Sequence, residues 1–273
     1  MTKTRIATWV DWGDSFTHPE GSFYCGTTLE QKVNAAKISD GADLFLFLSD
    51  THTRNSSEFA VNGGLYPAHN LILGDQQHAQ ELGVANGLTT SPQLTEKLYD
   101  LVKDKKSGLI VPRHVFFQDY DGEPERLVKP AFTFGDVEKT YGVKKLNPRE
   151  FLDGGIGYIV NAKHLFNGAA LQSTEWIGDV EGVPSMEMNA FTLLKQKYGQ
   201  GKDLVFDING VVMGICIYQT ASGIKQLFPK AQVNVIADAS THLLVKELGF
   251  ENALDADKAI NAMCKQVGIN YIK

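Results

Sequence analysis

One cysteine of this sequence lies where a thiol could act as a nucleophile. Cys216 follows a strand-like segment after a turn that contains Asn209 and Gly210, and it falls in the first turn of the next helical segment. The N–H groups and the positive dipole end at a helix start favour a thiolate and can stabilise the oxyanion of acyl transfer. A lone cysteine in an apolar helix is otherwise a buried, inert residue, which is what we expect of Cys25 and Cys264. Cys216 is therefore the candidate nucleophile.

Two charged residues could assist such a thiol. Asp11 follows the first strand-like run, and Lys163 follows the third. A carboxylate can accept the thiol proton, and a lysine cation can hold the carboxylate and the thiolate in register. An aspartate after a strand is often only a turn residue, and a lysine is usually solvated. The prediction therefore depends on their common position at the ends of strands.

Asp50, His52 and His69 form a candidate metal site. Asp50 and His52 follow the second strand-like run, and residues two apart in an extended segment point to the same side. One carboxylate and one imidazole can therefore share an ion, with His69 as a third ligand and positions left open for water or a pyridine-type nitrogen. These ligand types suit zinc, iron or manganese, although aspartate and histidine are also ordinary loop residues.

The elements that would position these residues alternate along the chain. Short runs rich in β-branched and aromatic residues predict six strands, at residues 5–10, 43–48, 157–160, 203–208, 233–237 and 269–272. The intervening patterns predict helices over residues 29–38, 185–198, 215–227, 239–248 and 256–267. This alternation is typical of an α/β fold with a doubly wound, six-stranded, mostly parallel sheet and helices on both faces. In such sheets ligands bind outside the carboxyl ends of the strands, where the candidate residues lie.

One interval breaks this alternation. Roughly ninety residues separate the second strand from the third, far more than a single crossover needs. We expect residues 70–155 to form an inserted lobe, a lid or an oligomer contact, within a single domain over residues 1–273. Inside the lobe, the patterns predict a helix over residues 93–102 and strands over 108–117 and 127–134, around a turn at 121–124.

Composition restricts the partners of the chain. The 26 Lys+Arg against 32 Asp+Glu give a net charge of -6 without a basic block, so no nucleic-acid partner is expected. No run of 18 apolar residues and no signal-peptide pattern occurs, so we expect no membrane association and a cytoplasmic location. Three cysteines without a CxxC pair argue against a disulfide framework and against structural zinc.

Five segments resemble motifs of the isochorismatase-like cysteine hydrolases, most closely the nicotinamidases (pyrazinamidases). Residues 10–16, with Pro19 and Gly21-Ser22, are similar to V-D-x-Q-N-D-F…P-G-G-S. Residues 49–52, with Ser57-x-Phe59, are similar to R-D-W-H…I-S-F, and residues 66–69 to W-P-x-H. Residues 210–216 are similar to G-V-A-T-[DE]-x-C, and residues 235–239 to V-x-x-D-A. The resemblance covers roughly residues 4–70 and 156–272, and leaves the insertion out.

The resemblance implies a catalytic triad and an oxyanion hole. The triad would be Asp11, Lys163 and Cys216. The oxyanion hole would be the N–H groups of Val212 and Cys216, with a cis peptide before Val212. Because Lys163 lies farther from Cys216 in the sequence than is usual for the family, Lys129 and Arg113 are alternatives for the cation.

The resemblance also implies a metal site and a substrate pocket. Asp50, His52 and His69 would bind a divalent metal, commonly zinc, and Phe16 and Tyr66 would be aromatic walls around a pyridine ring. Several positions around these residues depart from the family pattern: Gly13, Ser15, Thr51, Tyr66, Asn70, Met213 and Gly214. The resemblance therefore indicates the reaction class more closely than the substrate.

The predicted function is a metal-dependent cysteine amidohydrolase that deamidates nicotinamide to nicotinate and ammonia through a thioester. One alternative is a related hydrolase of another small amide, carbamoyl or ureido compound. A second is a catalytically silent family member that binds a small molecule or a partner protein. The expected partner is a small-molecule amide substrate, and self-association into a homo-oligomer stays open.

Overall fold

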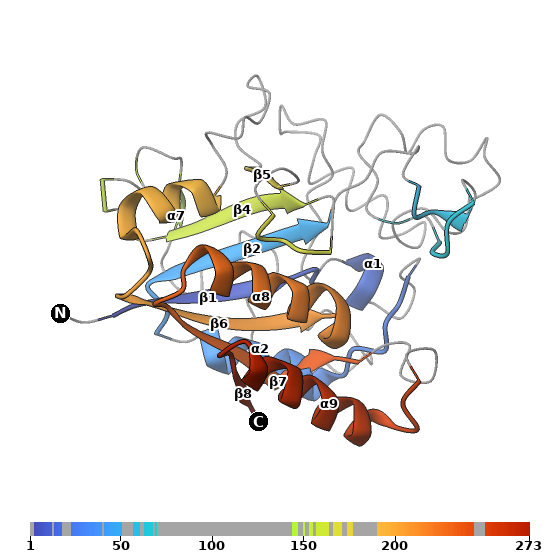
Figure 1. The fold of residues 1–273 in the computed structure, drawn as a ribbon. Coiled ribbons are helices and arrows are strands. Elements are labelled where there is room, and N and C mark those ends of the chain that lie inside the picture. Colours follow the sequence, from blue (N-terminus) through green and yellow to red (C-terminus); the bar gives the residue numbers. More distant parts are fainter. Residues whose placement is uncertain are drawn as a thin grey trace, which may run out of the picture.

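A single mixed sheet forms the centre of the molecule (Figure 1). The computed structural model describes residues 3–12, 14–17, 23–39, 41–50, 57–60, 63–67, 69, 144–146, 150, 153–154, 157–163, 166–170, 174–176, 190–242 and 249–273. Among these, the sheet has eight strands, which are β1 (Thr4–Val10), β2 (Leu44–Asp50), β3 (Lys144–Lys145), β4 (Gly157–Lys163), β5 (Thr174–Trp176), β6 (Leu204–Val211), β7 (Gln232–Thr241) and β8 (Asn270–Ile272). The order is β3-β4-β2-β1-β6-β7-β8, all parallel, with β5 antiparallel on β4.

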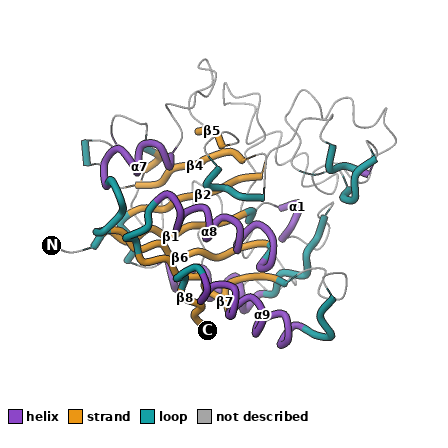
Figure 2. Tube along the Cα trace, in the orientation of Figure 1, coloured by secondary structure: helices purple, strands orange, loops and turns teal. Residues whose placement is uncertain are grey.

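Helices cover both faces of this sheet, as Figures 1 and 2 show. The helices are α1 (Asp14–Thr17), α2 (Leu29–Ser39), α7 (Ala190–Tyr198), α8 (Tyr218–Leu227) and α9 (Ala253–Gln266). Leu46, Phe206 and Val235 share a buried cluster with residues of α7, α8 and α9 on one face. On the other face, the Nε1–H of Trp9 donates to the hydroxyl of Ser39 in α2 at 2.6 Å. The predicted fold class is therefore confirmed.

All six predicted strands are present, and β3 and β5 join them. The predicted helix over residues 239–248 is wrong at its start, because residues 239–241 continue strand β7; residues 243–248 lie outside the described part. The register shifts between Ile208 and Gly210, so that Ser240 and Thr241 pair with Gly210 and Val211 of β6. This long-range pairing outweighs the local helical pattern.

The predicted insertion lies mostly outside the described residues. Its helix at 93–102, its strands at 108–117 and 127–134 and its turn at 121–124 all belong to the part that is not described. Within the predicted 70–155 range, strand β3 pairs with β4 and so belongs to the main sheet. Among the described helices, none combines the length and the apolar character needed to cross a membrane.

The parallel strands bring several candidate side chains together at the carboxyl ends of the strands. Asp11 follows the last residue of β1, and Asp50 and Lys163 are the last residues of β2 and β4. Asp50 and Lys163 are also paired in the β2–β4 register. Val212 follows β6, between Val211 and the helical turn that carries Cys216. Residues far apart in sequence therefore meet beyond the carboxyl ends of the central strands.

Candidate active site

Asp11 is held at the end of β1 by an unusual backbone conformation. Its φ is 55°, in the left-handed region. Its N–H donates to the carbonyl oxygen of Leu48 at 2.9 Å, and its Oδ1 accepts from the N–H of Asp50 at 3.1 Å. Both bonds connect Asp11 to β2, so the carboxylate lies over the end of the neighbouring strand.

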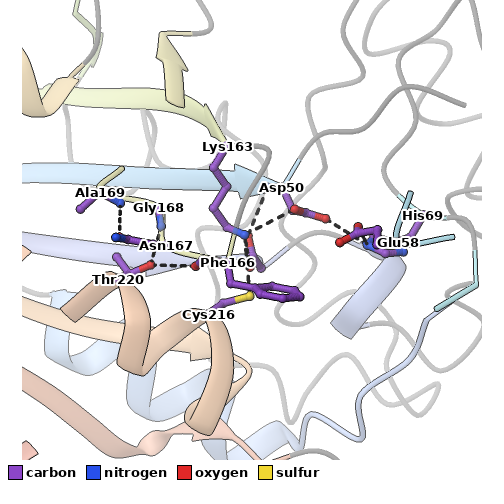
Figure 3. A network of polar contacts seen from close by, with 11 residues as sticks. Asp50, Glu58, His69, Lys163, Phe166, Asn167, Gly168, Ala169, Cys216 and Thr220 are labelled. Carbon is purple, nitrogen blue, oxygen red and sulfur yellow. Dashed lines mark hydrogen bonds and ion pairs between the residues drawn. The ribbon is translucent and has the colours of Figure 1, made fainter. Parts of the chain in front are cut away.

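Lys163 connects the acidic groups with the thiol. Its side chain is 1% exposed, and its Nζ lies 2.8 Å from Asp11 Oδ2 and 3.4 Å from Asp50 Oδ1. The same Nζ lies 3.7 Å from Cys216 Sγ (Figure 3). The structure thus brings together the three residues predicted as a triad. Lys129 and Arg113, the alternatives for the cation, lie outside the described residues.

Cys216 lies in a π-helical turn, Met213–Ile217, that leads into α8. The peptide bond between Val211 and Val212 is cis, as the resemblance implies. The Val212 carbonyl oxygen accepts from the N–H groups of Ile215 and Ile217 at 3.1 Å and 3.2 Å. These bonds hold the turn in place, and Cys216 is half-buried at the edge of the cavity.

Burial governs the electrostatics of the three groups. Burial raises the pKa of Asp11 to about 6, although the Lys163 ammonium acts to lower it. Burial also raises the pKa of the Cys216 thiol well above its usual value, and Asp11 and Asp50 raise it further against the opposing effect of Lys163. Burial acts to lower the pKa of Lys163, but Asp11, Cys216 and Asp50 raise it well above the usual value.

Burial acts on the thiol against the effect expected from its position at a helix start. It raises the pKa of Cys216 well above the usual value, whereas the N–H groups of a helix start favour a thiolate. Such a thiol needs a base to become a nucleophile. Asp11, with its own raised pKa, is the carboxylate close enough to Lys163 and Cys216 to act as one.

Asp50, Glu58 and His69 form a cluster that could hold a metal ion. One donor atom from each lies within 4.8 Å of the others. His69 Nε2 lies 3.1 Å from Asp50 Oδ2 and 3.4 Å from Glu58 Oε1. His69 Nδ1 lies 2.7 Å from the carbonyl oxygen of Pro67, and a hydrogen bond there leaves Nε2 directed at the two carboxylates. Two carboxylates and one imidazole suit zinc, manganese or iron.

Glu58 is the member of this cluster that the sequence reasoning missed, whereas His52 lies outside the described residues. A backbone hydrogen bond helps to position the glutamate, because the Tyr66 N–H donates to the Glu58 carbonyl oxygen at 2.9 Å. Gly64 packs directly on the backbone of Glu58, where a Cβ would clash. An acidic residue between two predicted ligands was the signal that could have identified it.

Aromatic side chains line the cavity above the thiol. Phe16 and Tyr66, the predicted walls, both border it, and Phe23 and Phe166 are two further walls that the sequence reasoning missed. The cavity has about 430 Å³ of empty space, part of it open to solvent. The ring centroids of Phe23 and Tyr66 are 5.3 Å apart, and those of Phe16 and His69 are 5.1 Å apart. The apolar walls thus extend from the thiol to the possible metal ligands.

Comparisons with known proteins identify the fold. No protein-family model matches the sequence, and no curated protein matches it significantly. PnC1 from L. infantum in complex with nicotinate is similar in structure, with a TM-score of 0.52, 14% identity, and coverage of 100% of this chain and 96% of that one. The yeast nicotinamidase Pnc1p bound to the inhibitor nicotinaldehyde has a TM-score of 0.50, 13% identity, and coverage of 98% and 99%. The chain therefore has the fold of the nicotinamidases, an α/β fold with a mostly parallel sheet.

Proposed function

We propose that this protein is a metal-dependent cysteine amidohydrolase that converts nicotinamide to nicotinate and ammonia. The observation that carries the proposal is the position of one buried ammonium, Lys163 Nζ, 2.8 Å from Asp11 Oδ2 and 3.7 Å from Cys216 Sγ. A thiol, a carboxylate and a cation at these separations are the groups that amide hydrolysis through a thioester requires.

In the proposed reaction, Asp11 accepts the proton of Cys216 while the sulfur attacks the carboxamide carbon. The pKa of about 6 makes Asp11 a stronger base than an exposed aspartate. The N–H groups of Val212 and Cys216 would donate to the carbonyl oxygen as negative charge develops there. The Lys163 ammonium would keep Asp11 and the sulfur in register and offset their charge.

The leaving nitrogen takes the proton from Asp11, so that the C–N bond breaks, ammonia departs and a Cys216 thioester remains. A water molecule then attacks the thioester carbon, with Asp11 accepting its proton. The C–S bond breaks, Asp11 returns its proton to the sulfur, and the product leaves as nicotinate once the proton of its carboxylic acid has passed to solvent. Asp11 thus acts as base, acid, base and acid in turn, a cycle for which a pKa near 6 is suited.

Asp50, Glu58 and His69 would hold the divalent cation, and we propose zinc for it, with His52 as a further ligand. When bound, the cation would supply positive charge against the two carboxylates and a coordination position for a neutral donor. The aromatic walls of the adjoining cavity favour a flat ring over an acyclic ureido or carbamoyl compound.

The proposal is tested by measuring ammonia release from nicotinamide with zinc-loaded protein, beside a panel of carbamoyl and ureido compounds. We expect activity on nicotinamide and a loss of at least about a thousandfold in Cys216→Ala. Cys264→Ala is the matched control, because Cys264 is buried in α9 and not among the residues that line the cavity, and it should retain turnover. Turnover by Cys216→Ala, or ammonia from the ureido compounds alone, would contradict the proposal.

A further inference from the structure

The loop that follows β4 carries one wall of the cavity. Phe166 is 37% exposed and borders the cavity together with Cys216. Its ring meets that of Tyr66 edge-on, with 6.4 Å between the ring centroids and an interplanar angle of 87°. Phe166 lies three residues after Lys163, so one short segment carries both the buried ammonium and this wall. A contact that holds the loop therefore also determines the shape of the cavity.

Thr220 of α8 holds this loop through two hydrogen bonds. Its hydroxyl accepts from the N–H of Gly168 at 2.9 Å and donates to the carbonyl oxygen of Phe166 at 3.4 Å (Figure 3). Thr220 is 0% exposed and the bond to Gly168 is buried, so that bond is shielded from water. Thr220 lies four residues after Cys216, so the residue that holds the loop comes shortly after the thiol in the same helical segment.

Two glycines allow the loop and α8 to approach closely enough for these bonds. A Cβ on Gly168 would lie 3.1 Å from Thr220 Oγ1 of α8 and 2.8 Å from Leu48 Cδ1. A Cβ on Gly223 of α8 would clash with the side chain of Asn167. The loop is thus packed tightly against the helix, and the Thr220 hydroxyl is the polar link in that contact.

We propose that Thr220 is a positioning residue that holds Phe166 as a wall beside Cys216 and thereby determines how tightly a ring-bearing amide binds. The nature of the substrate rests on the proposed function, whereas the link between Thr220 and the loop does not. Removing the hydroxyl would leave the buried Gly168 N–H and the Phe166 carbonyl oxygen without this partner, and the loop would move to satisfy them. Phe166 would then no longer close its side of the cavity.

Three variants test the role of the hydroxyl. Thr220→Val keeps the shape of the side chain and removes both hydrogen bonds, whereas Thr220→Ser keeps the hydroxyl. Ser222→Ala is the matched control on the same helix, because Ser222 Oγ has no hydrogen-bond partner among the described residues. We expect Thr220→Val to raise the KM for nicotinamide about tenfold, with kcat within about threefold of wild type. Thr220→Ser and Ser222→Ala should both stay close to wild type.

Hydrogen exchange measures the loop without any need for activity. The peptide over residues 166–170 should exchange faster in Thr220→Val than in wild type, Thr220→Ser or Ser222→Ala, since the Gly168 N–H loses its acceptor. Unchanged exchange in Thr220→Val would overturn the proposal. Faster exchange with an unchanged KM would overturn it equally, because the role would then be structural only.

A thiol reagent separates failure of this inference from failure of the proposed function. If the wild-type protein does not deamidate nicotinamide, the proposed function fails, and the wall is probed through Cys216 itself. The rate of Cys216 alkylation by N-phenylmaleimide, relative to N-ethylmaleimide, should fall several-fold in Thr220→Val alone. An equal ratio in all four proteins would overturn the positioning role.

Discussion

Two clusters of charged side chains show how differently one residue type behaves in two regions of this molecule. At the carboxyl ends of the central strands, the Asp11 side chain is 2% exposed beside Lys163, and burial raises its pKa to about 6 despite that ion pair. Beside the edge strand β8, the Asp257 side chain in α9 is 18% exposed. Its pKa is lowered instead.

The difference lies in the balance between burial and donors. Burial acts to raise the pKa of Asp257, but hydrogen bonds from Lys273, Tyr271 and His242 together lower it. Lys273 Nζ lies 2.6 Å from one carboxylate oxygen, and His242 Nε2 lies 2.7 Å from the other. At the candidate active site, by contrast, a single described ammonium is shared by two carboxylates and a thiol. A carboxylate with several hydrogen-bond donors stays an anion and stabilises the fold. A buried carboxylate that shares one cation with other groups has a raised pKa and can act as a base.

The largest effect should follow from removing the shared ammonium. Lys163→Met leaves Asp11 and Asp50 buried without their cation, so we expect a loss of about 3–5 kcal/mol in the free energy of unfolding and the loss of ammonia release. Urea unfolding and the nicotinamide assay measure the two effects. Lys258→Met is the control, because Lys258 is 66% exposed in a surface pair with Asp255, and it should change stability by less than about 1 kcal/mol. Equal effects of the two substitutions would contradict the comparison.

An intermediate effect is expected at the possible metal ligands. Glu58→Gln removes one of the two carboxylates around His69, so zinc affinity should fall at least about tenfold, and chelation should abolish the activity that added zinc restores. Competition with a chromogenic chelator measures the affinity. Glu150→Gln, in an exposed pair with Lys144, is the control and should bind zinc like wild type. Unchanged affinity in Glu58→Gln would exclude this glutamate from the metal site.

The smallest effect concerns the pH dependence of stability at Asp257. Because the folded pKa lies below the ordinary value of 3.8, this carboxylate stabilises the fold above that value, and the contribution is lost as pH falls through the folded pKa. Asp257→Asn should therefore lower stability at pH 7 by about 1 kcal/mol or less, and the difference from wild type should shrink below pH 3.8. Urea unfolding at pH 7 and at pH 3 measures this. A difference that grows towards low pH would contradict the assigned shift.

Much of the sheet could be predicted because its strands are continuous apolar runs. Residues 44–48 of β2 are buried without exception, which is the pattern of a parallel strand covered on both faces. The same topology predicted that Asp11, Asp50 and Lys163 would meet, because each follows or ends a parallel strand. The end of β7 could not be predicted in this way, since the pairing of Ser240 with Gly210 depends on a register shift between distant segments.

The site residues at the ends of strands could be predicted from the sequence, whereas those in the connecting turns could not. Glu58, Phe23 and Phe166 reach the cavity from turns whose course depends on contacts with other segments. Thr220 has no special sequence context, and its role follows only from its two hydrogen bonds to the loop after β4. Periodicity carries no information about such contacts, because it describes one element at a time.

The sequence by itself determined the fold class, the strand ends that carry charged residues, and one thiol at the start of a helical segment, because all three follow from local pattern and parallel topology. Tertiary structure decided the burial that shifts the pKa values of the catalytic groups, the presence of Glu58 beside Asp50 and His69, and the aromatic walls. Burial raises the pKa of Cys216, against the effect expected from the helix start, because desolvation depends on everything packed around a side chain and not on its neighbours in sequence.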